Sequence, residues 1–247
     1  MLSFINSSVD DYFQRTNTEN LTHQSTRPGK FWILLPVIGC VLFAILYVVA
    51  ALLYPGGSEK HKTMVGYNWT ENYWCNLLNK TAINGQNNTA KPVAITAMVI
   101  LCISLSFFWI LFPILVQSKK YHRIIIQIGG TASMIAAFLL LTNIDHDLAV
   151  NFSSSLGFVA MLGVLVALYQ LKWSKLLVFG LFNLLLIALN NYLYYIISDL
   201  SYLPIVQKLT FLSFLFWICC IEMNMYSSIK VKAWTTQSQR QKGTQRN

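Results

Sequence analysis

The chain has 247 residues, of which 55% are hydrophobic and only 11% are charged, against roughly 25% charged residues in an ordinary soluble domain. A water-soluble fold of this length could not bury so much apolar surface, whereas a bilayer is itself an apolar solvent. The net charge is +9, but the basic residues form no patch interleaved with aromatics and no nucleic-acid-binding motif occurs, so we expect no nucleic-acid partner. Composition therefore predicts an all-α integral membrane protein.

The first 30 residues form a polar segment that contains Asp10, Asp11 and Glu19. They lack the basic start followed directly by an apolar stretch that a signal peptide needs. We therefore interpret residues 1–30 as a polar tail and the first apolar run as a retained membrane helix.

Six apolar runs are long enough to cross about 30 Å of hydrocarbon, which takes ~20 helical residues. The predicted spans are 32–54, 92–116, 124–142, 149–170, 176–197 and 204–226. Together they predict a six-transmembrane-helix bundle over residues 31–226, followed by a basic tail at 227–247. Both tails are polar enough to predict disorder.

The basic residues predict the orientation of the bundle. Thirteen of the 18 Lys and Arg residues lie in the two tails and in the second and fourth connections. The other five are Lys60, Lys62, Lys80, Lys91 and Lys208. Because basic residues are retained in the cytoplasm, both termini are expected on the cytoplasmic side and the 55–91 loop on the outer side.

The 55–91 loop is the one long connection between predicted spans. Trp69, Tyr73 and Trp74 in it are typical of a membrane interface, and Gly56–Gly57 and Asn84–Gly85 indicate turns. We expect the loop to fold back as a cap over the outer ends of the helices.

The third connection contains Asp145, His146 and Asp147. A carboxylate can orient an adjacent imidazole and make it a better base or metal ligand. The alternative is that either acid simply caps the following helix. If that helix starts near Asp147, then Asp147, Asn151 and Ser154 share one face.

The fifth span carries Asn183, Asn190 and Tyr194 at spacings of seven and four residues. Asparagine in hydrocarbon must be hydrogen-bonded. These three residues therefore either form hydrogen bonds to neighbouring helices or line the wall of an outward-opening pocket. In the sixth span, Lys208 and Glu222 lie about 21 Å apart along a helix and cannot pair. Each is expected to extend to its own interface.

Several chemistries have no support in the sequence. Of the four histidines only His61 and His146 are expected on the outer side, too few for a three-histidine zinc site, although a mixed site with Asp145, Asp147 or Glu71 stays open. No nucleophile elbow, zinc-protease motif or phosphate-binding glycine loop occurs. We therefore expect neither a cofactor nor a metal.

A resemblance rests on the stretches 72–78, Asn-Tyr-Trp-Cys-Asn-Leu-Leu, and 84–87, Asn-Gly-Gln-Asn, followed by a helix with Met98 and Phe108-Trp109. Over residues 31–226 the chain resembles an uncharacterised family of six-helix bacterial membrane proteins, a domain of unknown function. That family is similar in plan to the Frag/DRAM/Sfk membrane proteins. The resemblance implies a bacterial plasma membrane but no activity.

These observations favour a non-enzymatic membrane protein that binds a lipid or small molecule in its outer half. The 55–91 loop would cover the pocket, with ligand-binding candidates His146, Asp147, Asn151, Asn190 and Glu71. One alternative is a membrane-embedded hydrolase or lipid-modifying enzyme that uses the Asp145–Asp147 loop. A small transporter is the other.

Overall fold

The computed structural model describes residues 30–116, 118–141, 146–196 and 200–244, without the side chains at 30, 140, 141, 146, 147, 200 and 229–244. The chain divides into two units, residues 1–32 and 33–247. Almost all described residues belong to the second unit, and the contacts that follow lie within it. Regular structure in the described residues is helical, apart from two isolated β-bridges in the 55–91 loop.

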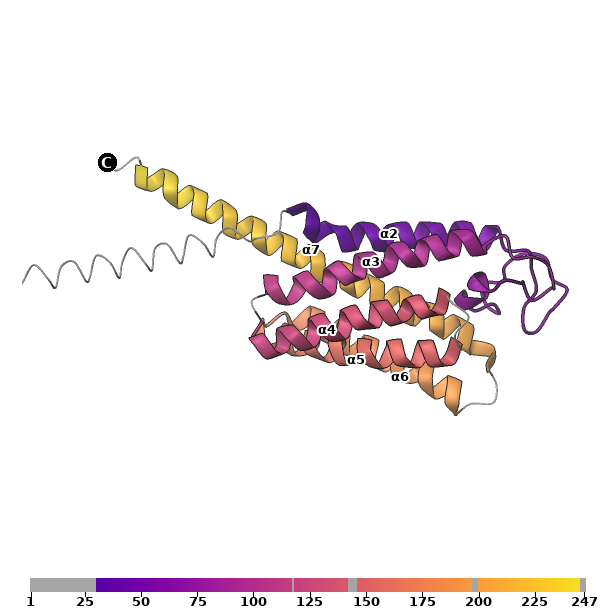
Figure 1. Ribbon diagram of the computed structural model, residues 1–247. Helices are drawn as coiled ribbons and strands as arrows, with labels where there is room; N and C mark the ends of the chain where they lie inside the picture. Colours follow the sequence, from indigo (N-terminus) through magenta and orange to yellow (C-terminus); the bar gives the residue numbers. More distant parts are fainter. Residues whose placement is uncertain (1–29, 117, 142–145, 197–199, 245–247) are drawn as a thin grey trace, which may run out of the picture. The chain divides into compact units, whose positions relative to one another are not determined.

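Six α-helices follow one another along the described chain (Figure 1). They are α2 (Lys30–Leu52), α3 (Lys91–Leu115), α4 (Lys120–Ala137), α5 (His146–Gln170), α6 (Ser174–Tyr195) and α7 (Leu203–Thr244). Three short 3-10 helices lie at Trp74–Leu78, Phe138–Leu141 and Leu200–Tyr202.

Five of these helices are long and apolar enough to cross a membrane. The qualifying stretches are Phe31–Leu52, Lys91–Leu115, Leu148–Gln170, Ser174–Tyr195 and Leu203–Ser228. Many of their large apolar side chains point outward, such as Val178 at 65% and Leu185 at 69% exposure. Helices that are apolar on their exposed faces are typical of a multi-pass membrane protein.

The helix predicted at 124–142 differs from expectation at both ends. α4 begins at Lys120 and ends at Ala137, and the chain continues as a 3-10 helix to Leu141. Lys120, His122 and Arg123 in the first turn of α4 lower its mean hydropathy. By composition α4 is therefore not among the five helices that are apolar enough to cross a membrane. The helical backbone bonds continue through these polar residues because none of them disfavours a helix strongly.

The predicted disorder of the C-terminal tail is wrong for most of that tail. α7 continues 18 residues past the predicted end of the last span and stops at Thr244. Lys, Gln, Arg and Ala in this stretch are good helix formers, and Gly243 is its only strong helix breaker. Apolar content predicted the membrane segment, whereas backbone propensity set the end of the helix.

Small residues allow neighbouring helices to approach closely. Between α4 and α5, Ser133 Oγ donates to the Ser153 carbonyl at 2.8 Å and Ser153 Oγ donates to the Ser133 carbonyl at 2.9 Å. Gly130 of α4 lies directly against the ring of Trp109 in α3. Such small-residue contacts replace the hydrophobic driving force that helices lack in lipid.

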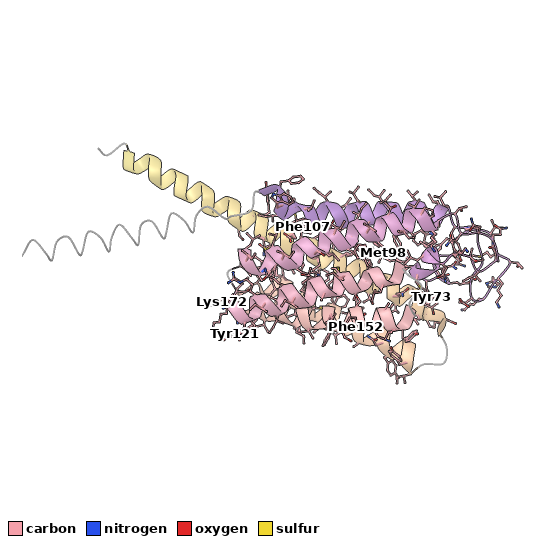
Figure 2. All side chains as sticks on the ribbon, in the orientation of Figure 1. Tyr73, Met98, Phe107, Tyr121, Phe152 and Lys172 are labelled. Atoms are coloured by element: carbon pink, nitrogen blue, oxygen red, sulfur yellow. The ribbon has the colours of Figure 1, made fainter. Side chains whose placement is uncertain are left out.

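Three connections can be assigned to one or the other end of this helix bundle from labelled residues. Figure 2 shows Tyr73, in the 55–91 loop, at one end and Tyr121 and Lys172, at the start of α4 and after α5, at the other. Lys172 has a positive φ of 57°, which closes the tight turn from α5 into α6.

Candidate functional site

The 55–91 loop is held by backbone hydrogen bonds and by contacts to the helices. Gly57 N donates to the Met64 carbonyl at 2.7 Å, and Asn84 N donates to the Gly56 carbonyl at 3.2 Å. Gly57 has φ of +86°, and a β-carbon there would lie 2.4 Å from Asn84 N, so a side chain would break this approach.

Trp74 attaches the loop to the bundle. Its ring centroid lies 5.8 Å from that of Phe43, 5.1 Å from Tyr47 and 5.2 Å from Phe211. Three aromatic partners on α2 and α7 at these distances form a tight apolar contact. Trp69, by contrast, is 47% exposed and has Tyr67 as its ring neighbour.

Lys208 of α7 also contacts the 55–91 loop. Its side chain is only 7% exposed, and Nζ donates to the carbonyls of Asn72 and Pro204, the latter at 3.0 Å. Nζ also lies 5.7 Å from the ring centroid of Tyr67. The expectation that Lys208 extends to the membrane interface is therefore wrong, because the folded loop supplies carbonyl and aromatic partners in place of water.

Three polar side chains of the loop form a hydrogen-bonded cluster, which we call the Glu71 cluster. The hydroxyl of Ser58 donates to Glu71 Oε2 at 2.5 Å, and His61 Nδ1 lies 3.1 Å from the same oxygen. Ser58 is fully buried, and its Oγ also accepts from the His61 backbone N–H at 2.9 Å. The hydrogen bonds from Ser58 and then His61 lower the pKa of Glu71, so this carboxyl is ionised at neutral pH.

This arrangement is not a catalytic triad. In a triad the serine hydroxyl donates to the histidine, and the acid orients that histidine. Here the Ser58 hydroxyl donates to Glu71 and not to His61, so the imidazole does not act as the base for the hydroxyl. What the cluster provides is an oriented carboxylate.

Glu71 lines a cavity of about 280 Å³ at this end of the bundle. The other lining residues are Lys60 and Thr70 of the loop and Ser201, Tyr202 and Ile205 around the start of α7. Because Oε2 of Glu71 already accepts two bonds, Oε1 is the oxygen left to accept from a ligand. The cavity therefore combines an anion, a cation and an apolar wall.

Asn151 and Asn190, two other sequence-predicted site residues, are not among the residues that line this cavity. Asp145 lies outside the described residues, as do the side chains of His146 and Asp147, although His146 is the first residue of α5. Asn151 Oδ1 accepts from the hydroxyl of Tyr195 at 2.9 Å, which ties α5 to α6. Asn190 has a buried Oδ1 with no hydrogen-bond partner among the described residues.

Sequence reasoning singled out Glu71, named His61 only as a possible metal ligand, and missed Ser58. Ser58 and His61 lie 13 and 10 residues away along the chain, and no local motif links them. The two glycines before Ser58 were the available signal, because they indicate the turn that brings the chain back towards Glu71.

We found no match to this chain among protein-family models, curated proteins or solved structures.

Proposed function

We propose that this chain is a six-span protein of a bacterial plasma membrane, with both termini in the cytoplasm, that binds an amine-bearing lipid headgroup or small molecule in the cavity beside Glu71. The observation that carries the binding proposal is the ionised Glu71 carboxylate, held by Ser58 and His61 at the edge of the cavity. An ionised carboxylate with one open oxygen favours a ligand with an ammonium group.

A sixth span is supported by the length of α4 and its 3-10 extension. Residues 124–141 would cover about 27 Å as an α-helix, close to the hydrocarbon thickness. Lys120 and Arg123 lie before this stretch, and side chains of this kind can extend to the headgroups. The same end of the bundle carries Lys172, as the excess of cytoplasmic basic residues requires.

Cysteine labelling tests this topology. In a Cys75→Ser background, a membrane-impermeant maleimide should modify Gln86→Cys in intact cells, because Gln86 is exposed in the 55–91 loop. Tyr121→Cys should stay unmodified until the cells are permeabilised, although Tyr121 is 81% exposed. Labelling of Tyr121→Cys from outside would refute the orientation.

The other residues that line the cavity indicate the chemical class of the ligand. Lys60 can contact a phosphate, while Tyr202 and Ile205 provide apolar surface for the chain next to it. A phosphoethanolamine group has the ammonium and phosphate that this pair of charges can bind. It can belong to phosphatidylethanolamine or to a soluble molecule.

Native mass spectrometry of the purified protein tests this assignment. Wild type should retain phosphatidylethanolamine in preference to phosphatidylglycerol, and Glu71→Gln should lose that preference, because an amide bears no charge for the ammonium group. A loss of about tenfold in affinity, or more, is expected for a removed charge-assisted contact.

Glu59→Gln is the matched control, since it removes the same charge from an exposed position of the same loop. It should bind as wild type does. Retention of phosphoethanolamine without acyl chains would identify the soluble molecule as the ligand. Equal preference in wild type and Glu71→Gln would contradict the proposal.

A further inference from the structure

Glu222 lies 14 residues after Lys208 on α7 and is completely buried. Its exposed fraction is 0%, so the expectation that this acid extends to the membrane interface is wrong. Neither of its carboxyl oxygens has a hydrogen-bond partner among the described residues. It is also the only acid within the five stretches that qualify as membrane spans.

Among the described side chains, no positively charged group pairs with Glu222. Cys219, one turn earlier on α7, and Cys40 of α2 are the titratable groups that interact with it electrostatically. The thiols of Cys40 and Cys219 lie close enough to influence each other's ionisation. Within the described residues the one close contact between a basic and an acidic side chain is His61–Glu71. Lys208 lies 14 positions from Glu222, about 21 Å along the helix.

The burial of Glu222 limits which positively charged species can neutralise its carboxylate. A buried carboxylate without a partner is strongly unfavourable, and it is neutralised by a proton or paired with a cation. No group of three or more metal-ligating side chains occurs in the part of the chain that the structure describes. A proton needs no such group, since a single carboxyl holds it.

We infer that Glu222 is a proton-binding site between α7 and α2, separate from the Glu71 cluster. In its protonated form the acid fits the apolar contact between the two helices. When it releases the proton, the carboxylate must acquire water or leave this contact. The protonation state of one side chain thus controls how α7 packs against α2, independently of the ligand proposed for the Glu71 cavity.

Dicyclohexylcarbodiimide tests the site, because this apolar reagent reacts with protonated acids in apolar surroundings. The carboxyl oxygen bonds to the carbodiimide carbon and its proton moves to a nitrogen, and the O-acylisourea then rearranges to a stable N-acylurea. Nothing leaves, and no further reactant is needed. The full-length protein in native membranes at neutral pH should gain one adduct, in the α7 peptide that contains Glu222.

Two variants decide the assignment. Glu222→Gln should lose the adduct and keep the melting temperature of wild type, because a neutral amide replaces a neutral acid of the same shape. Glu71→Gln should keep the adduct, since Glu71 is ionised and lies in the loop. The Glu222→Gln control also excludes a reaction of the neighbouring thiols.

The pH dependence tests whether the proton exchanges. Labelling of Glu222 should fall as pH is raised, because only the protonated acid reacts. If labelling stays constant as pH rises, Glu222 holds its proton permanently, which would contradict the inference that it exchanges a proton. The absence of an adduct in folded wild type, or a lower melting temperature for Glu222→Gln, would overturn the site, because each would indicate an ionised carboxylate paired with a cation.

Discussion

Replacing Gly130 by alanine is expected to destabilise the bundle strongly. A β-carbon at this position would lie 2.2 Å from Cγ and Cδ2 of Trp109, far inside van der Waals contact. Trp109 is only 1% exposed, and its ring cannot move aside without displacing neighbours in the core. Overpacking of this kind costs about 1–3 kcal/mol and occasionally more. The loss of stability would be measured as a lower melting temperature of the detergent-purified variant.

Gly129→Ala is the matched control, one residue away on the same helix. Its β-carbon would lie 3.3 Å from the Leu156 carbonyl oxygen and 3.5 Å from the Ala160 β-carbon, so the neighbours need to shift by only a few tenths of an ångström. It should melt close to wild type. Equal melting temperatures for the two variants would contradict the close contact between α3 and α4.

Trp74→Ala should release the 55–91 loop from the bundle. The substitution removes the ring that contacts Phe43, Tyr47 and Phe211, and truncation of a large packed aromatic costs about 3 kcal/mol or more. If cleavage follows the population of the open loop, limited proteolysis from the loop side should accelerate roughly a hundredfold.

Trp69→Ala provides the comparison for the same loop and the same change of residue. Because Trp69 is already 47% exposed and does not contact these three rings, its removal should change the cleavage rate little. Similar rates for Trp69→Ala and Trp74→Ala would mean that the aromatic contact does not hold the loop.

Apolar content predicted the helices because a bilayer requires long apolar segments whose backbone groups pair within each segment. The six predicted spans overlap α2 to α7. The errors occur where helices continue through polar residues, at the start of α4 and in α7 beyond Tyr226. Hydropathy indicates whether a segment of helix is suited to lipid or to water. Helix propensity and capping decide where the backbone hydrogen bonds of the helix end.

The sequence by itself determined the helical class and singled out Glu71 as a candidate ligand-binding residue, since both follow from residue type and local pattern. Only the tertiary structure decided that Ser58 and His61 orient Glu71, that Lys208 contacts the 55–91 loop, and that Glu222 is buried. These features depend on which distant backbone or side-chain groups replace water around a polar atom. That replacement is set by the packing of whole elements, which a pattern of neighbouring residues does not encode.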